Sequence, residues 1–98
     1  MSRELIVRPE AEVEMAEAYH WYEACSPGLG ADFLLSVEAV VRAAARNPLQ
    51  FAVVHRGIRR GLTRRFPYQV FFLDDEQRVV VLAVLHAKRD PERWKDRT

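Results

Sequence analysis

The sequence predicts an α+β domain: an N-terminal strand, an antiparallel helical hairpin, and then a three-stranded antiparallel meander. Three observations support this order. Strand-like apolar runs occupy both ends of the chain, two stretches with helical spacing lie between them, and short breaks rich in Pro, Gly or Asp separate the elements. The simplest packing places both helices on one face of the sheet. The length suits a single domain, residues 1–98.

The first strand is expected at residues 3–9, and Pro9 both stops it and suits the first turn of a helix. From Glu10 the apolar residues recur four and three apart, which gathers them on one helical face. Trp21 falls on the opposite, acidic side, where it either folds over its neighbours or contacts a partner. The predicted core stripe is Ala11, Met15, Ala18, Tyr22 and Cys25, and the predicted acidic side is Glu10, Glu14 and Glu17.

A turn at residues 26–30, with one Pro and two Gly, predicts that a second helix returns antiparallel to the first. This helix should run from about Leu29 to Arg46, because Asn47-Pro48 ends it. Its predicted core stripe is Leu29, Phe33, Val37, Val40, Val41 and Ala44. An outer apolar patch able to dock a partner or a second copy is formed by Leu35, Ala39 and Ala43, beside Arg42 and Arg46.

The rest of the chain is predicted to be strands. Residues 49–57 are expected to connect to a strand at about Ile58 to Arg65, followed by a second strand at 67–73. A tight turn at 74–77 leads to the last strand, 78–86. This strand is apolar at both odd and even positions, which indicates that it is covered on both faces or lies at the sheet centre.

Composition excludes several classes of function. The chain is 49% hydrophobic and 30% charged, as in a folded soluble protein. The single Cys25 rules out an internal disulfide framework or a multi-cysteine zinc site, so a cytoplasmic location is expected. The three histidines have no ligand-like spacing and no glycine loop is suited to phosphate, so neither metal nor cofactor is expected. No apolar run reaches the length of a membrane span, and no signal-peptide core is present.

Charge is distributed unevenly along the chain. Residues 1–50 carry four Arg/Lys against eight Asp/Glu, whereas residues 51–98 carry eleven against six. Such a basic half presents a face to an acidic partner, or it is an ordinary solvated surface. Five arginines lie within residues 55–65, namely Arg56, Arg59, Arg60, Arg64 and Arg65.

The last strand ends in a second basic group, made of His86, Lys88 and Arg89. If the last strands are neighbours, this group shares a surface with the arginines before "FPY". Arginine stabilises phosphate and histidine exchanges protons, so Arg65, His86 and Arg89 are candidate catalytic residues for phosphodiester chemistry. The same site could instead bind an acidic protein, with His86 an ordinary hydrogen-bonded residue. After it, Asp90 can cap a helical turn that begins at Pro91, and Trp94 can cover the sheet and anchor the tail.

Several stretches together resemble the ParE/RelE superfamily of bacterial toxins. They are residues 8–23, the run Arg-Arg-Phe-Pro-Tyr at 64–68, and the ending His-x-x-Arg-x-Pro-x-x-Trp at 86–94. The last two are more similar to the ParE branch, often labelled plasmid stabilisation proteins. The resemblance implies the toxin of a type II toxin–antitoxin module, wrapped and silenced by a labile antitoxin that is ParD-like or related. ParE-like members inhibit DNA gyrase, whereas RelE-like members cut messenger RNA in the ribosome without metal.

The sequence departs from the RelE pattern, because no tyrosine follows His86 and the only lysines are Lys88 and Lys95. Two hypotheses therefore stand. One is a gyrase-binding toxin, and the alternative is a ribosome-dependent endoribonuclease that uses His86 with Arg65 or Arg89. An inactive relative that only binds its antitoxin is a third, weaker reading. The residues expected to contact target or antitoxin are Arg56, Arg59, Arg60, Arg64, Arg65, Lys88, Arg89, Trp94 and Trp21.

Overall fold

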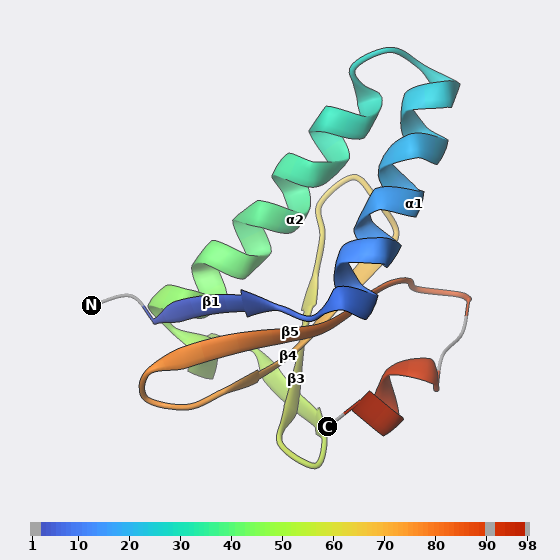
Figure 1. The fold of residues 1–98 in the computed structure, drawn as a ribbon. Helices are drawn as coiled ribbons and strands as arrows, with labels where there is room; N and C mark the ends of the chain where they lie inside the picture. The colour runs from blue at the N-terminus through green and yellow to red at the C-terminus, as the bar shows by residue number, and fades with distance from the viewer. Residues whose placement is uncertain (1–2, 90–91, 98) are drawn as a thin grey trace.

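The computed structural model describes residues 3–89 and 92–97 and has the predicted α+β architecture, with both helices on one face of a sheet (Figure 1). Among the described residues, no helix has both the length and the apolar character needed to cross a bilayer. The elements in chain order are β1 (Glu4–Val7), α1 (Pro9–Cys25), α2 (Leu29–Arg46), η1 (Pro48–Gln50), β2 (Ala52–His55), β3 (Ile58–Leu62), β4 (Tyr68–Asp74), β5 (Arg78–His86) and η2 (Arg93–Arg97).

The sheet has the strand order β1-β5-β4-β3-β2. β1 runs parallel to β5, with Glu4 opposite Arg78 and Val7 opposite Val81, and every other pair is antiparallel. The predicted central position of the last strand is confirmed, because β5 lies between β1 and β4 and residues 81–85 are all buried. One residue of β5, Leu82, has no partner in β4, which places a bulge in the middle of the strand.

The meander has four strands, because β2 forms within the segment that was expected to be a connection. Its turn into β3 consists of Arg56 and Gly57, whose φ angles are 45° and 81°. Two successive positive φ angles suit the tight hairpin turns that match strand twist. Asn-Gly or Asp-Gly usually announces such a turn, and an arginine at the first position gives no such signal. The strand expected to reach Arg65 also ends earlier, at Leu62, where Thr63 closes the next turn by donating to Phe66 O at 2.7 Å.

The helical hairpin closes through two local contacts. The Glu23 carboxylate at the end of α1 accepts hydrogen bonds from the Gly28 and Gly30 amides at 2.9 and 3.0 Å, which caps the start of α2. Gly30 also lies directly against α1, where a Cβ atom would come within 2.7 Å of Tyr19 O. The hairpin therefore depends on a residue without a side chain at this position.

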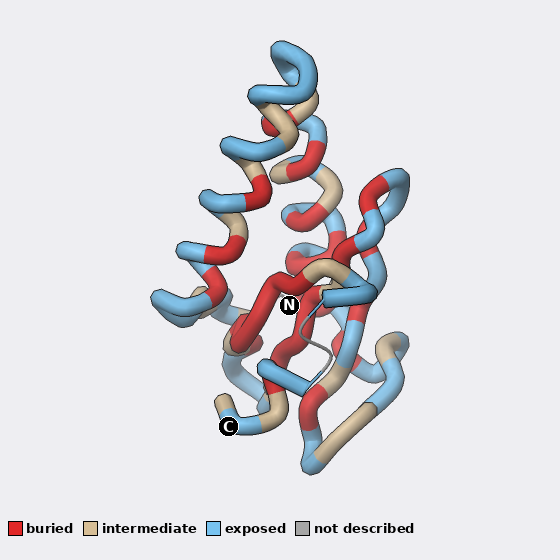
Figure 2. Tube along the Cα trace, turned by 90° about the vertical axis from the view of Figure 1, so that its right-hand side faces the viewer, coloured by how far each residue is buried: buried red, intermediate tan, exposed pale blue. Residues whose placement is uncertain are grey.

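Apolar side chains are buried on both faces of the sheet, as the buried stretch of the central strand indicates in Figure 2. On one face, α1 and α2 cover a cluster that includes Phe33, Val37 and Val70. On the other face, η2 places Trp94 over Phe71, so the prediction that Trp94 anchors the tail is confirmed. Asp90 and Pro91, predicted to cap that turn, lie outside the described residues.

Two predictions for α1 were wrong. Cys25 was assigned to the core stripe but is exposed, because it occupies the last residue of the helix beyond the cover of α2. Glu14 was assigned to the solvated acidic side but is buried together with Ala11 and Ala18. The inner side of α1 faces the end of β5 as well as α2, so its buried face is wider than the apolar stripe alone predicts.

Candidate functional site

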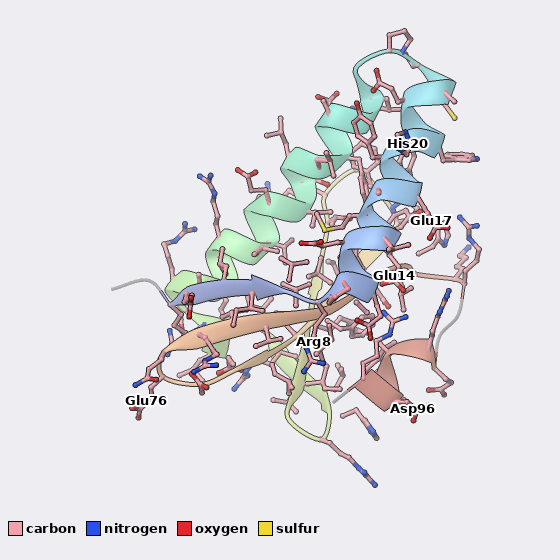
Figure 3. The ribbon with its side chains drawn as sticks, in the orientation of Figure 1. Arg8, Glu14, Glu17, His20, Glu76 and Asp96 are labelled. Atoms are coloured by element: carbon pink, nitrogen blue, oxygen red, sulfur yellow. The ribbon has the colours of Figure 1, made fainter. Side chains whose placement is uncertain are left out.

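A groove of about 330 Å³ lies between α1 and the end of β5. In Figure 3, Glu14 and Glu17 project from α1 on the side that faces the C-terminal segment. The groove thus brings together side chains from both halves of the chain and joins acidic, basic and aromatic groups. Its lining is Glu14, Glu17, Ala18 and Trp21 from α1, Tyr68 from β4, Val84, Leu85 and His86 from β5, and Arg89 and Arg93 after β5.

A tyrosine, a histidine and an arginine meet in this groove. Tyr68 at the start of β4 pairs directly with His86 at the end of β5, and their ring centroids are 5.4 Å apart in an edge-on contact. Nδ1 of His86 accepts a hydrogen bond of 3.1 Å from the Lys88 amide. The chain turns immediately after β5, where the Ala87 amide donates to Pro67 O at 2.7 Å, and this turn brings Arg89 back toward Tyr68.

Burial and nearby charges shift the pKa values of Tyr68, which lines the groove, and of Tyr22, which contacts Tyr68. Burial raises the pKa of the Tyr68 hydroxyl; the Arg89 guanidinium opposes this through its charge and a hydrogen bond, and Glu17 reinforces it. Burial likewise raises the pKa of Tyr22, which the charges of Tyr68 and Arg89 shift in opposite directions. The groove therefore holds the neutral phenol of Tyr68 beside the Arg89 guanidinium, an arrangement suited to hydrogen bonding with an anionic or polar ligand.

An ion pair borders the groove on the side of the C-terminal segment. Glu14 and Arg97 are 8% and 13% exposed, and Arg97 Nη1 donates to Glu14 Oε1 at 2.9 Å. Glu14 Oε2 lies 2.8 Å from Arg97 Nη2, close enough for charge attraction but without the alignment of a hydrogen bond. The hydrogen bond that Arg97 donates to Glu14 raises the pKa of Arg97 above its usual value, with burial acting in the opposite direction. The contact joins residues 83 positions apart in the chain.

The arginines of residues 55–65 do not share one surface. Arg56 lies in the β2–β3 turn, whereas Arg64 and Arg65 lie in the β3–β4 turn at the opposite end of β3. Arg59 is half-buried: its Nε donates to Asp74 Oδ1 at 2.8 Å and its Nη1 to Phe51 O at 2.7 Å. Its neighbour Arg60 is exposed and points to the other face of the sheet.

Arg65, the third candidate for catalysis, does not line the groove that holds His86 and Arg89. Its guanidinium approaches Asp32 on α2 at 3.8 Å and lies 5.5 Å from the centre of the Phe66 ring. Its φ of 72° also places the residue in the left-handed region, which fixes the direction of the turn. The structure thus brings together two of the three proposed catalytic residues.

The remaining candidates for contact differ in accessibility. Lys88 and Arg89 are exposed, and Trp21 is 62% exposed at the rim of the groove, as expected for a residue on the outer side of α1. Trp94 is only 7% exposed, so its ring reaches a partner only if the tail leaves the sheet. Within residues 3–89 and 92–97, no three His, Cys, Asp or Glu side chains are grouped as in a metal site.

Sequence reasoning missed the groove residues Tyr68 and Glu14, and it missed Arg97, which pairs with Glu14 beside the groove. Tyr68 was visible in the "FPY" run, but its pairing with His86 depends on strand register, which the sequence does not announce. Glu14 was placed on the acidic side because its position lies opposite the predicted apolar stripe of α1. Its burial depends on two partners distant in sequence, the Arg97 guanidinium and the Val84 amide.

Comparisons with known proteins identify the family. A family model described as the ParE toxin of the type II toxin–antitoxin system parDE matches residues 5–91. A curated-protein search found no match in sequence. The fold is similar to that of a chain in the chromosomal ParDE system from P. aeruginosa, with a TM-score of 0.76, 15% identity, and coverage of 89% of this chain and 98% of that one.

A second similar fold occurs in the RelBE2 toxin–antitoxin complex from Mycobacterium tuberculosis. Its TM-score is 0.62 at 20% identity, covering 88% of this chain and 99% of that one. At these identities the two structures establish the shared fold alone. The family match extends from β1 through β5 to the residues after His86, and on this basis the chain belongs to the ParE toxin family of type II toxin–antitoxin systems.

Proposed function

We propose that this toxin arrests growth in the cytoplasm by binding and inhibiting DNA gyrase, and that a ParD-like antitoxin silences it. Family membership supports the class of toxin. The observation that favours binding over cutting is the hydrogen bond between the Lys88 amide and Nδ1 of His86.

That hydrogen bond selects the tautomer of the neutral ring. A backbone N–H is always a donor, so Nδ1 must accept, and the neutral imidazole then carries its proton on Nε2. A general base needs a free lone pair on the nitrogen that faces the substrate. His86 in this tautomer can donate a hydrogen bond through Nε2 but cannot take a proton there. The group therefore suits recognition better than proton transfer.

Ribosome-dependent cleavage of messenger RNA is the second candidate, and one observation favours it. Tyr68, His86 and Arg89 share one groove, and together they offer a phenol, an imidazole and a guanidinium. In such a reaction Arg89 would neutralise the phosphate and His86 would receive the proton of the attacking ribose hydroxyl. That step requires the bond from the Lys88 amide to break first, because it occupies Nδ1 and sets the wrong tautomer.

The two candidates differ in which process fails first. After induction of the toxin alone in a sensitive bacterium, incorporation of labelled thymidine and labelled amino acids is followed minute by minute. The gyrase proposal expects DNA synthesis to stop first, and purified toxin should inhibit supercoiling by purified gyrase. Earlier arrest of protein synthesis, with gyrase unaffected, would overturn the proposal.

Replacing one histidine sharpens the distinction. His86→Gln should leave growth arrest intact under the binding proposal, because glutamine can still accept from the Lys88 amide. If His86 were the acid–base catalyst, the variant would cut about 10²–10⁴-fold more slowly. His20→Gln is the matched control, since His20 is exposed on α1 and does not line the groove.

The antitoxin is expected to be acidic and to bind the exposed arginines together with the outer side of the helical hairpin. Arg56, Arg60 and Arg64 are all exposed and available for such a contact. Raising salt from about 0.1 to 1 M shortens the screening length from roughly 10 to 3 Å and should weaken the complex. Affinity that does not change with salt would show that apolar contacts on the hairpin carry the binding instead.

A further inference from the structure

Part of the central strand has no neighbour on one side. β1 ends at Val7, opposite Val81, whereas β5 continues to His86. Among the described residues, β4 still pairs with β5 on the other side in this last part, but no strand follows β1 on its side. An open sheet edge presents backbone N–H and C=O groups that are costly to bury without partners.

Two side chains occupy the place of the missing strand. Glu14 Oε1 accepts a hydrogen bond from the Val84 amide at 3.0 Å, as a carbonyl of a neighbouring strand would. Arg97 Nη1 donates to the Leu82 carbonyl at 3.2 Å, as an amide would. Leu82 is the bulge residue without a partner in β4, and this contact supplies its carbonyl with a hydrogen bond. The edge is thus completed by one residue of α1 and one residue of the C-terminal segment.

The same two side chains are also bound to each other. Arg97 donates to Glu14 at 2.9 Å, and both side chains are nearly buried. Breaking such a pair from one side leaves the other charge buried without a partner, which is strongly unfavourable. The C-terminal segment therefore cannot move away from the sheet without breaking this pair.

We infer that Glu14 and Arg97 form a clasp that holds the C-terminal segment against the open edge of β5 and so positions the basic residues beside the groove for the target. Arg89 and Arg93 lie in the chain between the fixed strand and the clasp, and both line the groove. Glu14 and Arg97 are positioning residues in this arrangement. The inference rests on the proposed binding function of the groove and the tail.

The test distinguishes release of the C-terminal segment from a general loss of folding stability. Arg97→Met opens the clasp and leaves the Glu14 carboxylate buried without a positive charge beside it. The double variant with Glu14→Gln and Arg97→Met also opens it but removes the buried charge, so it should regain stability. Lys95→Met is the matched control, because it removes one positive charge from the same short helix, where Lys95 contacts the nearby Glu92.

Two measurements report release of the C-terminal segment: amide exchange at Val84 and fluorescence quenching of Trp94. Exchange of the Val84 amide should be faster by about tenfold or more in Arg97→Met than in the parent chain. Acrylamide quenching of Trp94 fluorescence, measured in a Trp21→Phe background, should increase in Arg97→Met and in the double variant. Both variants should also need several-fold more inducer to arrest growth, whereas Lys95→Met should behave as the parent.

Two results would overturn the clasp. One is a double variant in which Trp94 stays as protected from acrylamide as in the parent. The other is a released segment that still arrests growth at the parental inducer level. If the parent chain itself fails to inhibit gyrase, the proposed target is wrong, while the exchange and quenching measurements still decide whether the clasp exists.

Discussion

Trp94 lies flat on Phe71, with ring centroids 4.2 Å apart and ring planes inclined by only 10°. His55 from β2 contacts the same indole edge-on at 5.8 Å. The face of the sheet that lacks helices is therefore closed by one aromatic ring from the C-terminal segment. Loss of that ring should therefore lower the stability of the fold directly, whatever its effect on partner binding.

Replacement of Trp94 is thus expected to destabilise the protein. Trp94→Ala should lower the free energy of unfolding by about 3–5 kcal/mol, the usual cost of removing a large buried aromatic side chain. Urea denaturation followed by circular dichroism measures this. Trp94→Phe, which keeps an aromatic ring over Phe71, should cost less than half as much. A loss below about 1 kcal/mol for Trp94→Ala would mean that the stack contributes little.

Two adjacent arginines of β3 should behave differently. Arg59→Met breaks a largely buried ion pair with Asp74 and should lower the free energy of unfolding by about 2–4 kcal/mol. Arg60→Met removes the same charge from an exposed position and should change it by less than about 0.5 kcal/mol. Thermal unfolding of both variants tests this contrast. Equal losses would show that local charge, and not the Asp74 pair, sets the effect.

Gly30 controls how closely the two helices approach. Gly30→Ala places a Cβ atom within 3 Å of Tyr19 O and the Tyr19 ring, so the hairpin must open. We expect a loss of about 1–3 kcal/mol, as for other overpacked sites. Ala31→Ser, at the next and exposed position, provides the control and should change stability by less than about 0.5 kcal/mol. An unchanged Tm for Gly30→Ala would contradict the tight contact.

Alkaline pH should weaken the fold through Tyr68, the tyrosine of the groove. The pKa of Tyr68 is raised by burial, so the unfolded chain loses this proton near pH 10 while the folded chain still holds it. The stability linked to this proton is fully present below pH 10 and declines as pH rises toward the folded pKa. Urea denaturation from pH 8 to 11 should show a smaller decline for Tyr68→Phe. An identical decline in both proteins would mean that other groups cause it.

The limits of β5 and α2 were predictable because each has a strong and uninterrupted local signal. β5 is an apolar run bounded by an acidic turn and a basic end, and α2 carries an apolar stripe that stops at Asn47-Pro48. Both elements therefore have the predicted bounds. β2 was not predictable in this way, since it has only four residues and its turn uses Arg56, which is uncommon at a positive φ.

Only some of the groove residues could be predicted from the sequence, for a different reason. His86 and Arg89 follow a strand, and local reasoning finds them. Tyr68 joins them through cross-strand register, and Glu14 meets Arg97 across nearly the whole chain. Contacts of this kind depend on the completed fold, so no window of sequence contains them. The ion pair between Arg59 and Asp74 also depends on strand register, although these residues are only 15 positions apart.

The parallel pairing of β1 with β5 also determines when the toxin can become folded during its synthesis. Glu4 is paired with Arg78, so β1 cannot take its place in the sheet until β5 has been synthesised. Translation proceeds from the N-terminus at roughly 5–20 residues per second, and pairings distant in sequence form slowly. A nascent chain that has not yet released β5 from the ribosome lacks both the middle of its sheet and the end of its groove. The groove between α1 and β5 is therefore assembled only after β5 has left the ribosome.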